Sequence, residues 1–192
     1  MIEFRDLTEQ DIEVRTQSVG TFQKGGKTKA YATLLLYKNA RVDMAILDET
    51  VGPENWQRQH KELKGNMYCA VGINVRFRDK NVEPLWVWKE DCGTESNTEK
   101  EKGESSDSFK RACVNWGIGR ELYTKIPITI FDVPYKEKNN KLQVDGAFEV
   151  EKIIVKSNQI TALSLLYVKG NTKKRCFVWT ADKGTQLSKV GE

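Results

Sequence analysis

Hydrophobic and polar positions change their spacing several times along this chain, and each spacing predicts a structural element. Residues 30–37 (AYATLLLY) are aromatic, aliphatic and β-branched, which is typical of a strand. Asn39 can cap a helix that would end at Gly52, because asparagine is a preferred first residue and glycine a common terminator. From residue 55 to residue 91 the pattern becomes that of strands separated by turns, which predicts a three-stranded antiparallel meander.

Residues 107–116 (DSFKRACVNW) have the period of an amphipathic helix. The apolar positions at i, i+3, i+4 and i+7 are Phe109, Ala112, Cys113 and Trp116. Gly117 would end this helix, because glycine adopts the terminal left-handed conformation at little cost. Lys110 and Arg111 lie off the apolar stripe, so we expect them to face outward while the helix packs across the meander.

Beyond residue 126 the alternation returns. Residues 148–155, 160–168 and 175–179 alternate like strands and predict a second meander, whereas residues 134–142 are expected to form a polar loop and residues 18–29 a Gly/Lys-rich loop or hairpin tip. The fold class is therefore α+β: a three-stranded antiparallel meander packed on a long helix, a β-β-β-α core, followed by a C-terminal β meander.

We divide the chain into three segments on this basis. Residues 1–29 are a polar and basic lead-in, residues 30–125 form the core, and residues 126–192 form a C-terminal β extension. With 39% hydrophobic and 30% charged residues, the chain can bury a core of its own. No apolar run is long enough for a membrane span, no secretory signal is visible, and the four cysteines are not spaced as metal ligands. We therefore expect a cytoplasmic protein that contacts no membrane.

Positive charge is clustered although the net charge is only +4. Lys24, Lys27 and Lys29 belong to a basic stretch between residues 14 and 42 that has no acidic residue. A second basic region contains Lys169, Lys173, Lys174, Arg175, Lys183 and Lys189. The aromatic residues Phe22 and Tyr31 lie beside the lysines of the first stretch, a combination that suits single-stranded nucleic acid.

Enzymatic motifs are weak by comparison. His60 is the only histidine, and no serine lies in a G-x-S-x-G motif. Gly26-Lys27-Thr28 lacks the preceding glycine of a phosphate loop, because Thr21 stands at that position. The remaining enzymatic alternative is a metal-dependent nuclease built from Glu83, Lys89 and Asp91. We expect a protein without catalytic residues, cofactor or metal.

Four motifs follow one another over about residues 30–123: Arg41-Val42 at a helix start, Gly52 before Trp56, a meander over residues 57–91, and Lys110-Arg111-Ala112 in a helix that ends at Gly117. This ordered set resembles the Rad-fifty-two/Sak family of single-strand annealing proteins, in its phage branch from Gram-positive hosts. The resemblance implies ATP-independent annealing of single-stranded DNA by a ring or filament of identical subunits in recombination and double-strand break repair. It also implies a bacterial host cytoplasm, and a single-strand binding protein is a candidate partner.

The resemblance assigns DNA contacts to Arg41, Lys110 and Arg111. A further family arginine falls on Val114 here, and we expect Arg120 or Lys24, Lys27 and Lys29 to supply that charge. Two alternatives stay open: a single-strand binding accessory protein of phage replication that does not anneal, and the metal-dependent nuclease.

Overall fold

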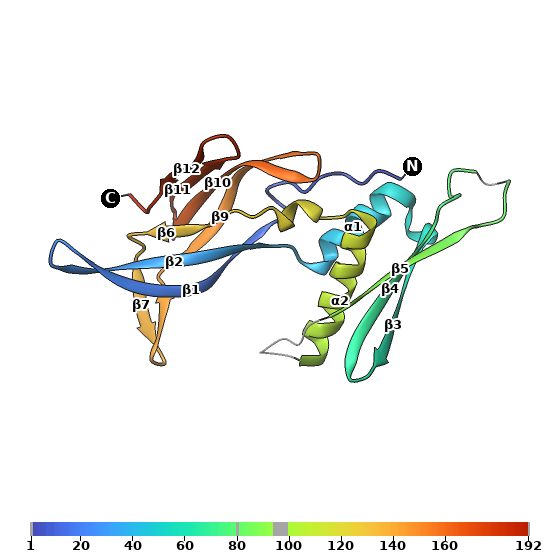
Figure 1. Cartoon of the computed structure of the whole chain (residues 1–192), viewed down its shortest axis with the longest axis horizontal. Coiled ribbons are helices and arrows are strands. Elements are labelled where there is room, and N and C mark those ends of the chain that lie inside the picture. The colour runs from blue at the N-terminus through green and yellow to red at the C-terminus, as the bar shows by residue number, and fades with distance from the viewer. Residues whose placement is uncertain (1, 80, 94–99, 192) are drawn as a thin grey trace. The chain divides into compact units, whose positions relative to one another are not determined.

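The computed structural model describes residues 2–79, 81–93 and 100–191, which form two compact units (Figure 1). The α+β unit comprises residues 2–6 and Asn39–Arg120, and the β unit comprises Leu7–Lys38 and the described residues from Glu121 onward. Apart from residues 2–6, the α+β unit is thus encoded between two parts of the β unit. None of the helices described is long and apolar enough to cross a membrane.

Two helices and a meander build the α+β unit. The elements are α1 (Ala40–Val51), the 3-10 turn η1 (Pro53–Asn55), β3 (Trp56–Leu63), β4 (Asn66–Asn74), β5 (Trp86–Cys92) and α2 (Lys100–Trp116). The predicted cap of α1 is confirmed: the Asn39 side chain accepts a hydrogen bond from the Arg41 backbone N–H, and Gly52 follows the helix with a φ of 85°.

The sheet of this unit has the order β3-β4-β5, and α2 packs on one face of it, as predicted (Figure 1). Val71 and Ile73 of β4 are fully buried on that face, as are Phe109 and Cys113 of α2. The Trp116 indole N–H donates to the Val71 carbonyl oxygen at 3.0 Å, which ties the end of the helix to the central strand. Burial of these apolar side chains between sheet and helix stabilises the unit.

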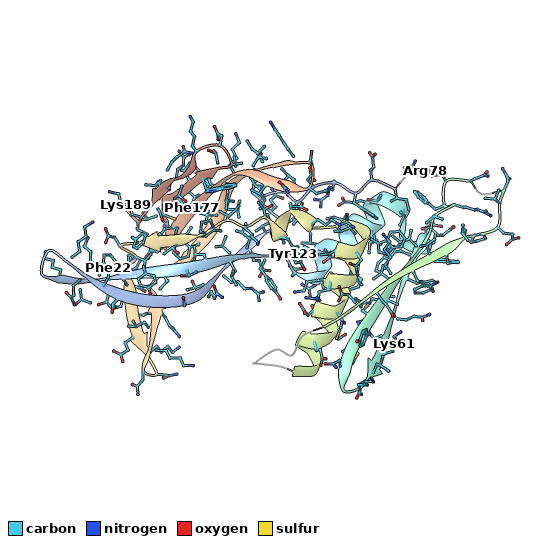
Figure 2. The ribbon with its side chains drawn as sticks, in the orientation of Figure 1. Phe22, Lys61, Arg78, Tyr123, Phe177 and Lys189 are labelled. Atoms are coloured by element: carbon cyan, nitrogen blue, oxygen red, sulfur yellow. The ribbon has the colours of Figure 1, made fainter. Side chains whose placement is uncertain are left out.

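The β unit consists of two larger sheets and a small hairpin. Its elements are β1 (Glu13–Lys24), β2 (Lys27–Tyr37), η2 (Arg120–Tyr123, begun by the last residue of the α+β unit), β6 (Thr129–Phe131), β7 (Tyr135–Lys138), β8 (Lys141–Val144), β9 (Ala147–Lys156), β10 (Gln159–Lys169), β11 (Thr172–Thr180) and β12 (Gly184–Ser188). The sheet orders are β1-β2-β6 and β12-β11-β10-β9. Ala32 and Ile130 of the first sheet share one core with Leu165 and Phe177 of the second (Phe177 is labelled in Figure 2).

The predicted C-terminal meander is confirmed and contains a fourth strand, β12. Residues 134–142, expected as a loop, instead contribute to the β7–β8 hairpin, which turns at Asn139 and Asn140 with φ values of 53° and 56°. In residues 18–29 only Gly25 and Gly26 form the hairpin tip, because β1 extends to Lys24.

The compact units also divide the chain differently from the three segments expected. Strand β2 pairs with β1 on one side and with β6 on the other, so residues 30–37 belong with the C-terminal strands rather than with the β3–β4–β5 meander.

Candidate nucleic-acid interface

Arg41 is one of the four cations expected in the α+β unit. It lies in the first turn of α1, and its side chain is exposed. A cation at a helix N-terminus gains nothing from the helix dipole, so helix stability does not account for this arginine.

Lys110 is placed differently from what the helical pattern predicts. Lys110 is only 8% exposed, and its Nζ lies 3.9 Å from Asp107 Oδ1. The expectation that Lys110 faces outward is therefore wrong, because its side chain is buried. Arg111 is partly exposed, and its Nε lies 3.3 Å from Asp91 Oδ1 on β5.

Arg120 closes the C-terminal end of α2. Its Nε donates to the Val114 carbonyl oxygen at 2.9 Å, and its Nη2 donates to the Asn115 carbonyl oxygen at 3.0 Å. Lys89 of β5 donates to the same Asn115 oxygen at 2.9 Å, with its Nζ 4.5 Å from the centre of the Trp116 ring. The last carbonyl groups of a helix lack partners within the helix, so these two cations serve helix α2.

The three lysines of the β1–β2 hairpin lie together on one face of the β1–β2–β6 sheet. Residues two apart in a strand share a face, and directly paired residues lie side by side. Phe22 pairs with Lys29, and Lys24 pairs with Lys27, so all four side chains belong to the same face.

Tyr31 and Phe131 complete this face, because Tyr31 pairs with Gly20 on one side and with Phe131 on the other. We call it the hairpin face, made of Gly20, Phe22, Lys24, Lys27, Lys29, Tyr31 and Phe131. The opposite side of the same strands carries Ala30, Ala32 and Ile130, which are buried in the core. The hairpin face is therefore the outward side of a sheet whose other side is packed.

The three aromatic rings of the hairpin face form one cluster. The Phe22 and Phe131 ring centres are 5.8 Å apart in an edge-to-face arrangement, and Tyr31 lies 6.5 Å from Phe22 and 6.3 Å from Phe131. Phe131 is 44% exposed, so the cluster is accessible from solvent. An exposed aromatic cluster offers ring faces on which planar groups can stack.

A groove of about 340 Å³ runs beside the cluster (Phe22 and Lys189 are labelled in Figure 2). It is lined by Phe22, Lys24, Phe131, Asp132, Gln186, Leu187, Ser188 and Lys189. Asp132 is its only carboxylate, and Lys29 Nζ lies 3.0 Å from Asp132 Oδ1, which offsets that negative charge. Lys24 and Lys189 thus give the groove a positive character. Sequence reasoning found Lys24, Lys27 and Lys29 but missed Phe131, which is about a hundred residues away in the chain.

Three of the six cations of the second basic region, Lys169, Lys173 and Arg175, are paired with carboxylates. Lys173 Nζ lies 2.6 Å from Glu149 Oε2, and Lys169 Nζ lies 2.6 Å from Asp145 Oδ2. Arg175 donates to both oxygens of Glu151 at 2.6 Å, and this hydrogen bonding lowers the pKa of the Glu151 carboxyl. Charge counted along the sequence therefore overstates what this region offers to a polyanion.

Two residues of the nuclease alternative have structural contacts: Lys89 donates to the end of α2, and Asp91 contacts Arg111. The single histidine, His60, has its Nε2 3.2 Å from the Ser105 carbonyl oxygen. Among residues 2–79, 81–93 and 100–191, no group of three or more His, Cys, Asp or Glu side chains is arranged to hold a metal ion. Comparison with known protein families, curated proteins and solved structures gave no match to this chain.

Proposed function

We propose that this protein binds single-stranded DNA and anneals complementary strands without ATP, as a homo-oligomer acting in recombination and double-strand break repair in a bacterial cytoplasm. The observation that carries the proposal is the hairpin face, where three lysines and three aromatic rings share the outward side of one sheet. Lysine ammonium groups pair with phosphates, and aromatic rings stack with bases of any sequence, so this combination suits a flexible single strand.

The annealing part of the proposal draws on the motifs around Arg41 and Lys110-Arg111 that resemble the Rad-fifty-two/Sak family. Annealing requires that the strand be held while the base edges remain available for pairing. Contacts to phosphates and to ring faces leave those edges free. An oligomer would present several hairpin faces to one strand, and avidity would make the assembly bind tightly where each face binds weakly. A single-strand binding protein is the partner we propose for delivery of the DNA.

The test is annealing of two complementary labelled oligonucleotides in EDTA without ATP, at low and at high salt. We expect acceleration at low salt that declines as salt rises, because phosphate contacts are screened. The triple variant Lys24/Lys27/Lys29→Ala should lose most of the acceleration. The matched control is Lys136/Lys138/Lys141→Ala, which removes the same charge from the β7–β8 hairpin of the same unit.

Each outcome has a distinct meaning. Equal loss in both triple variants would show that total charge, not the hairpin face, is responsible. Tight single-strand binding without acceleration would reduce the function to that of an accessory binding protein. Degradation of DNA with magnesium or manganese, abolished by a chelator, would replace the proposal with a nuclease.

A further inference from the structure

The outward side of the β3–β4–β5 sheet is a second open surface, in the other unit. Because α2 covers the side that contains Val71 and Ile73, the residues that alternate with them lie on the opposite side. We call this side the tryptophan face; it consists of Gln57, Gln59, Lys61, Tyr68, Ala70, Gly72, Trp86, Trp88 and Glu90. The described part of the α+β unit has both of its helices away from it: α2 packs on the buried side, and α1 contacts α2 and β3.

Trp88 lies flat on this sheet. It pairs with Gly72 of β4, and a Cβ atom added to Gly72 would lie 2.7 Å from Cδ2 and Cε2, the two atoms shared by the indole rings. An indole approached at its centre in this way lies face-on over the glycine backbone, which only a residue without a side chain permits. Its other face therefore points outward, and Trp88 is 38% exposed.

Two further features extend this platform. The Trp86 ring lies 6.4 Å from the Trp88 ring at an interplanar angle of 32°, so two indoles line strand β5. Gln57 pairs with Gly72 from the opposite strand, which places an exposed amide in the same row as Trp88. An amide both donates and accepts hydrogen bonds, as the edges of the bases do.

The charge of the tryptophan face is balanced. Lys61 is its one cation, and Lys61 Nζ lies 2.6 Å from Glu90 Oε2 on the same face (Lys61 is labelled in Figure 2). A strand bound here would gain little from its phosphates. What the face offers is ring surface and amides, which recognise uncharged planar groups rather than anions.

We propose that the tryptophan face stacks nucleobases of single-stranded DNA, with Trp88 as the platform and Gln57 and Gln59 at the base edges. The inference rests on the proposed function for its ligand class, but it assigns a different surface and different forces. Salt has little effect on stacking, whereas it weakens lysine–phosphate contacts. The tryptophan face should therefore hold bases under conditions in which the hairpin face has released its phosphates.

The experiment uses the full chain carrying Lys24/Lys27/Lys29→Ala, so that the hairpin face is disabled. Quenching of tryptophan fluorescence by a short oligothymidylate is measured at low and at high salt. We expect quenching that persists at high salt, and a loss of affinity of about fivefold or more when Trp88→Ala is added, as for removal of one stacking residue. Trp88→Phe should restore part of the affinity that Trp88→Ala loses. Trp179→Phe in the β unit is the matched control and should leave the affinity unchanged.

A second ligand makes the test specific for bases. An abasic oligonucleotide of the same length keeps the phosphates and should not quench. Equal quenching by the abasic strand, or quenching unchanged by Trp88→Ala, would overturn the proposal. A third outcome would also overturn it: no oligonucleotide quenches the fluorescence, and Trp88→Ala converts the wild-type oligomer into a monomer. The tryptophan face would then be a contact between copies of the chain. These results would leave intact the annealing test of the hairpin face, which fails or succeeds on its lysines.

Discussion

The two open sheet faces of this protein share a construction and differ in charge. Each belongs to a three-stranded antiparallel sheet whose other side is buried, and each sets an aromatic ring across from a glycine, Tyr31 over Gly20 and Trp88 over Gly72. The hairpin face adds three lysines, whereas the one lysine of the tryptophan face is paired with Glu90. Under the proposed function, the same backbone arrangement would serve two kinds of contact, with lysines binding phosphates and exposed rings stacking on bases.

The largest effect should come from the lysines of the hairpin face. For Lys24/Lys27/Lys29→Ala we expect single-strand affinity at low salt to fall about 10- to 100-fold. The slope of log affinity against log salt should decrease by about 2, since each lost phosphate contact on a single strand removes about 0.7. Fluorescence anisotropy across a salt series measures both. If Trp88→Ala changed the slope as much, the assignment of phosphate contacts to the hairpin face and base stacking to the tryptophan face would be wrong.

Removing a ring from the hairpin face should have the next largest effect. Phe131→Ala is expected to cost about 1 kcal/mol of binding free energy, the lower end of the usual contribution of a stacked base. Its salt slope should stay that of the wild type, because no phosphate contact is lost. The same anisotropy titrations test this prediction, and Phe131→Leu separates ring stacking from general apolar contact.

The two glycine–aromatic pairs allow a direct comparison. A Cβ at Gly20 would lie 2.5 Å from Tyr31 Cζ, and a Cβ at Gly72 would lie 2.7 Å from Trp88 Cδ2. Gly20→Ala and Gly72→Ala should each displace the ring and cost about 1–3 kcal/mol of stability through overpacking. Urea denaturation measures the cost. Binding at low salt should respond mainly to Gly20→Ala, and salt-resistant quenching mainly to Gly72→Ala; the reverse assignment would contradict the model of two faces.

Two arginines of the α+β unit should differ from each other in their effect on stability. Arg120→Ala removes two hydrogen bonds to the end of α2 and should lower the free energy of unfolding by about 1 kcal/mol. Arg41→Ala, at an exposed position, should change stability by less than about 0.5 kcal/mol. Denaturation of both variants, beside their single-strand affinities, separates structural from binding roles. A binding loss in Arg41→Ala at unchanged stability would support the DNA contact that the family resemblance assigns to it.

Two buried thiols, one in each unit, are internal reporters of stability. Burial raises the pKa of the Cys69 thiol in the α+β unit to about 11 and that of Cys176 in the β unit to about 12. Both thiols should stay unmodified by alkylating agents near neutral pH. Since their folded pKa values lie above the ordinary 9.0, stability should fall as the pH rises from about 9 towards 11. Peptide mass spectrometry after alkylation would show which unit a given substitution loosens.

Local signals account for the parts of the fold that the sequence predicts. Helix α1 was predictable because its cap and its terminator are adjacent to it, and β9 to β11 because their apolar alternation is regular. Strands β7 and β8 were missed because their side chains are mostly polar and exposed; the Asn139-Asn140 turn, with positive φ at both residues, was the available signal.

The candidate sites were less predictable because they depend on pairing between distant strands. The cluster of Lys24, Lys27 and Lys29 is visible in the sequence, but the ring of Phe131 joins it only through the β2–β6 register. Likewise nothing in the helical pattern of α2 shows that Lys110 is enclosed, or that Arg120 turns back onto the helix end.

The interrupted order of the β unit along the chain has a consequence for synthesis on the ribosome. All residues of the α+β unit precede residue 121, so this unit can fold as soon as α2 has emerged. The β1–β2 hairpin emerges earlier, yet the strands that cover Ala32 and Leu34 are translated only after the α+β unit is complete. A nascent chain of this protein therefore carries an uncovered apolar sheet surface for most of its translation. During this period a ribosome-associated chaperone would have the largest apolar surface to protect.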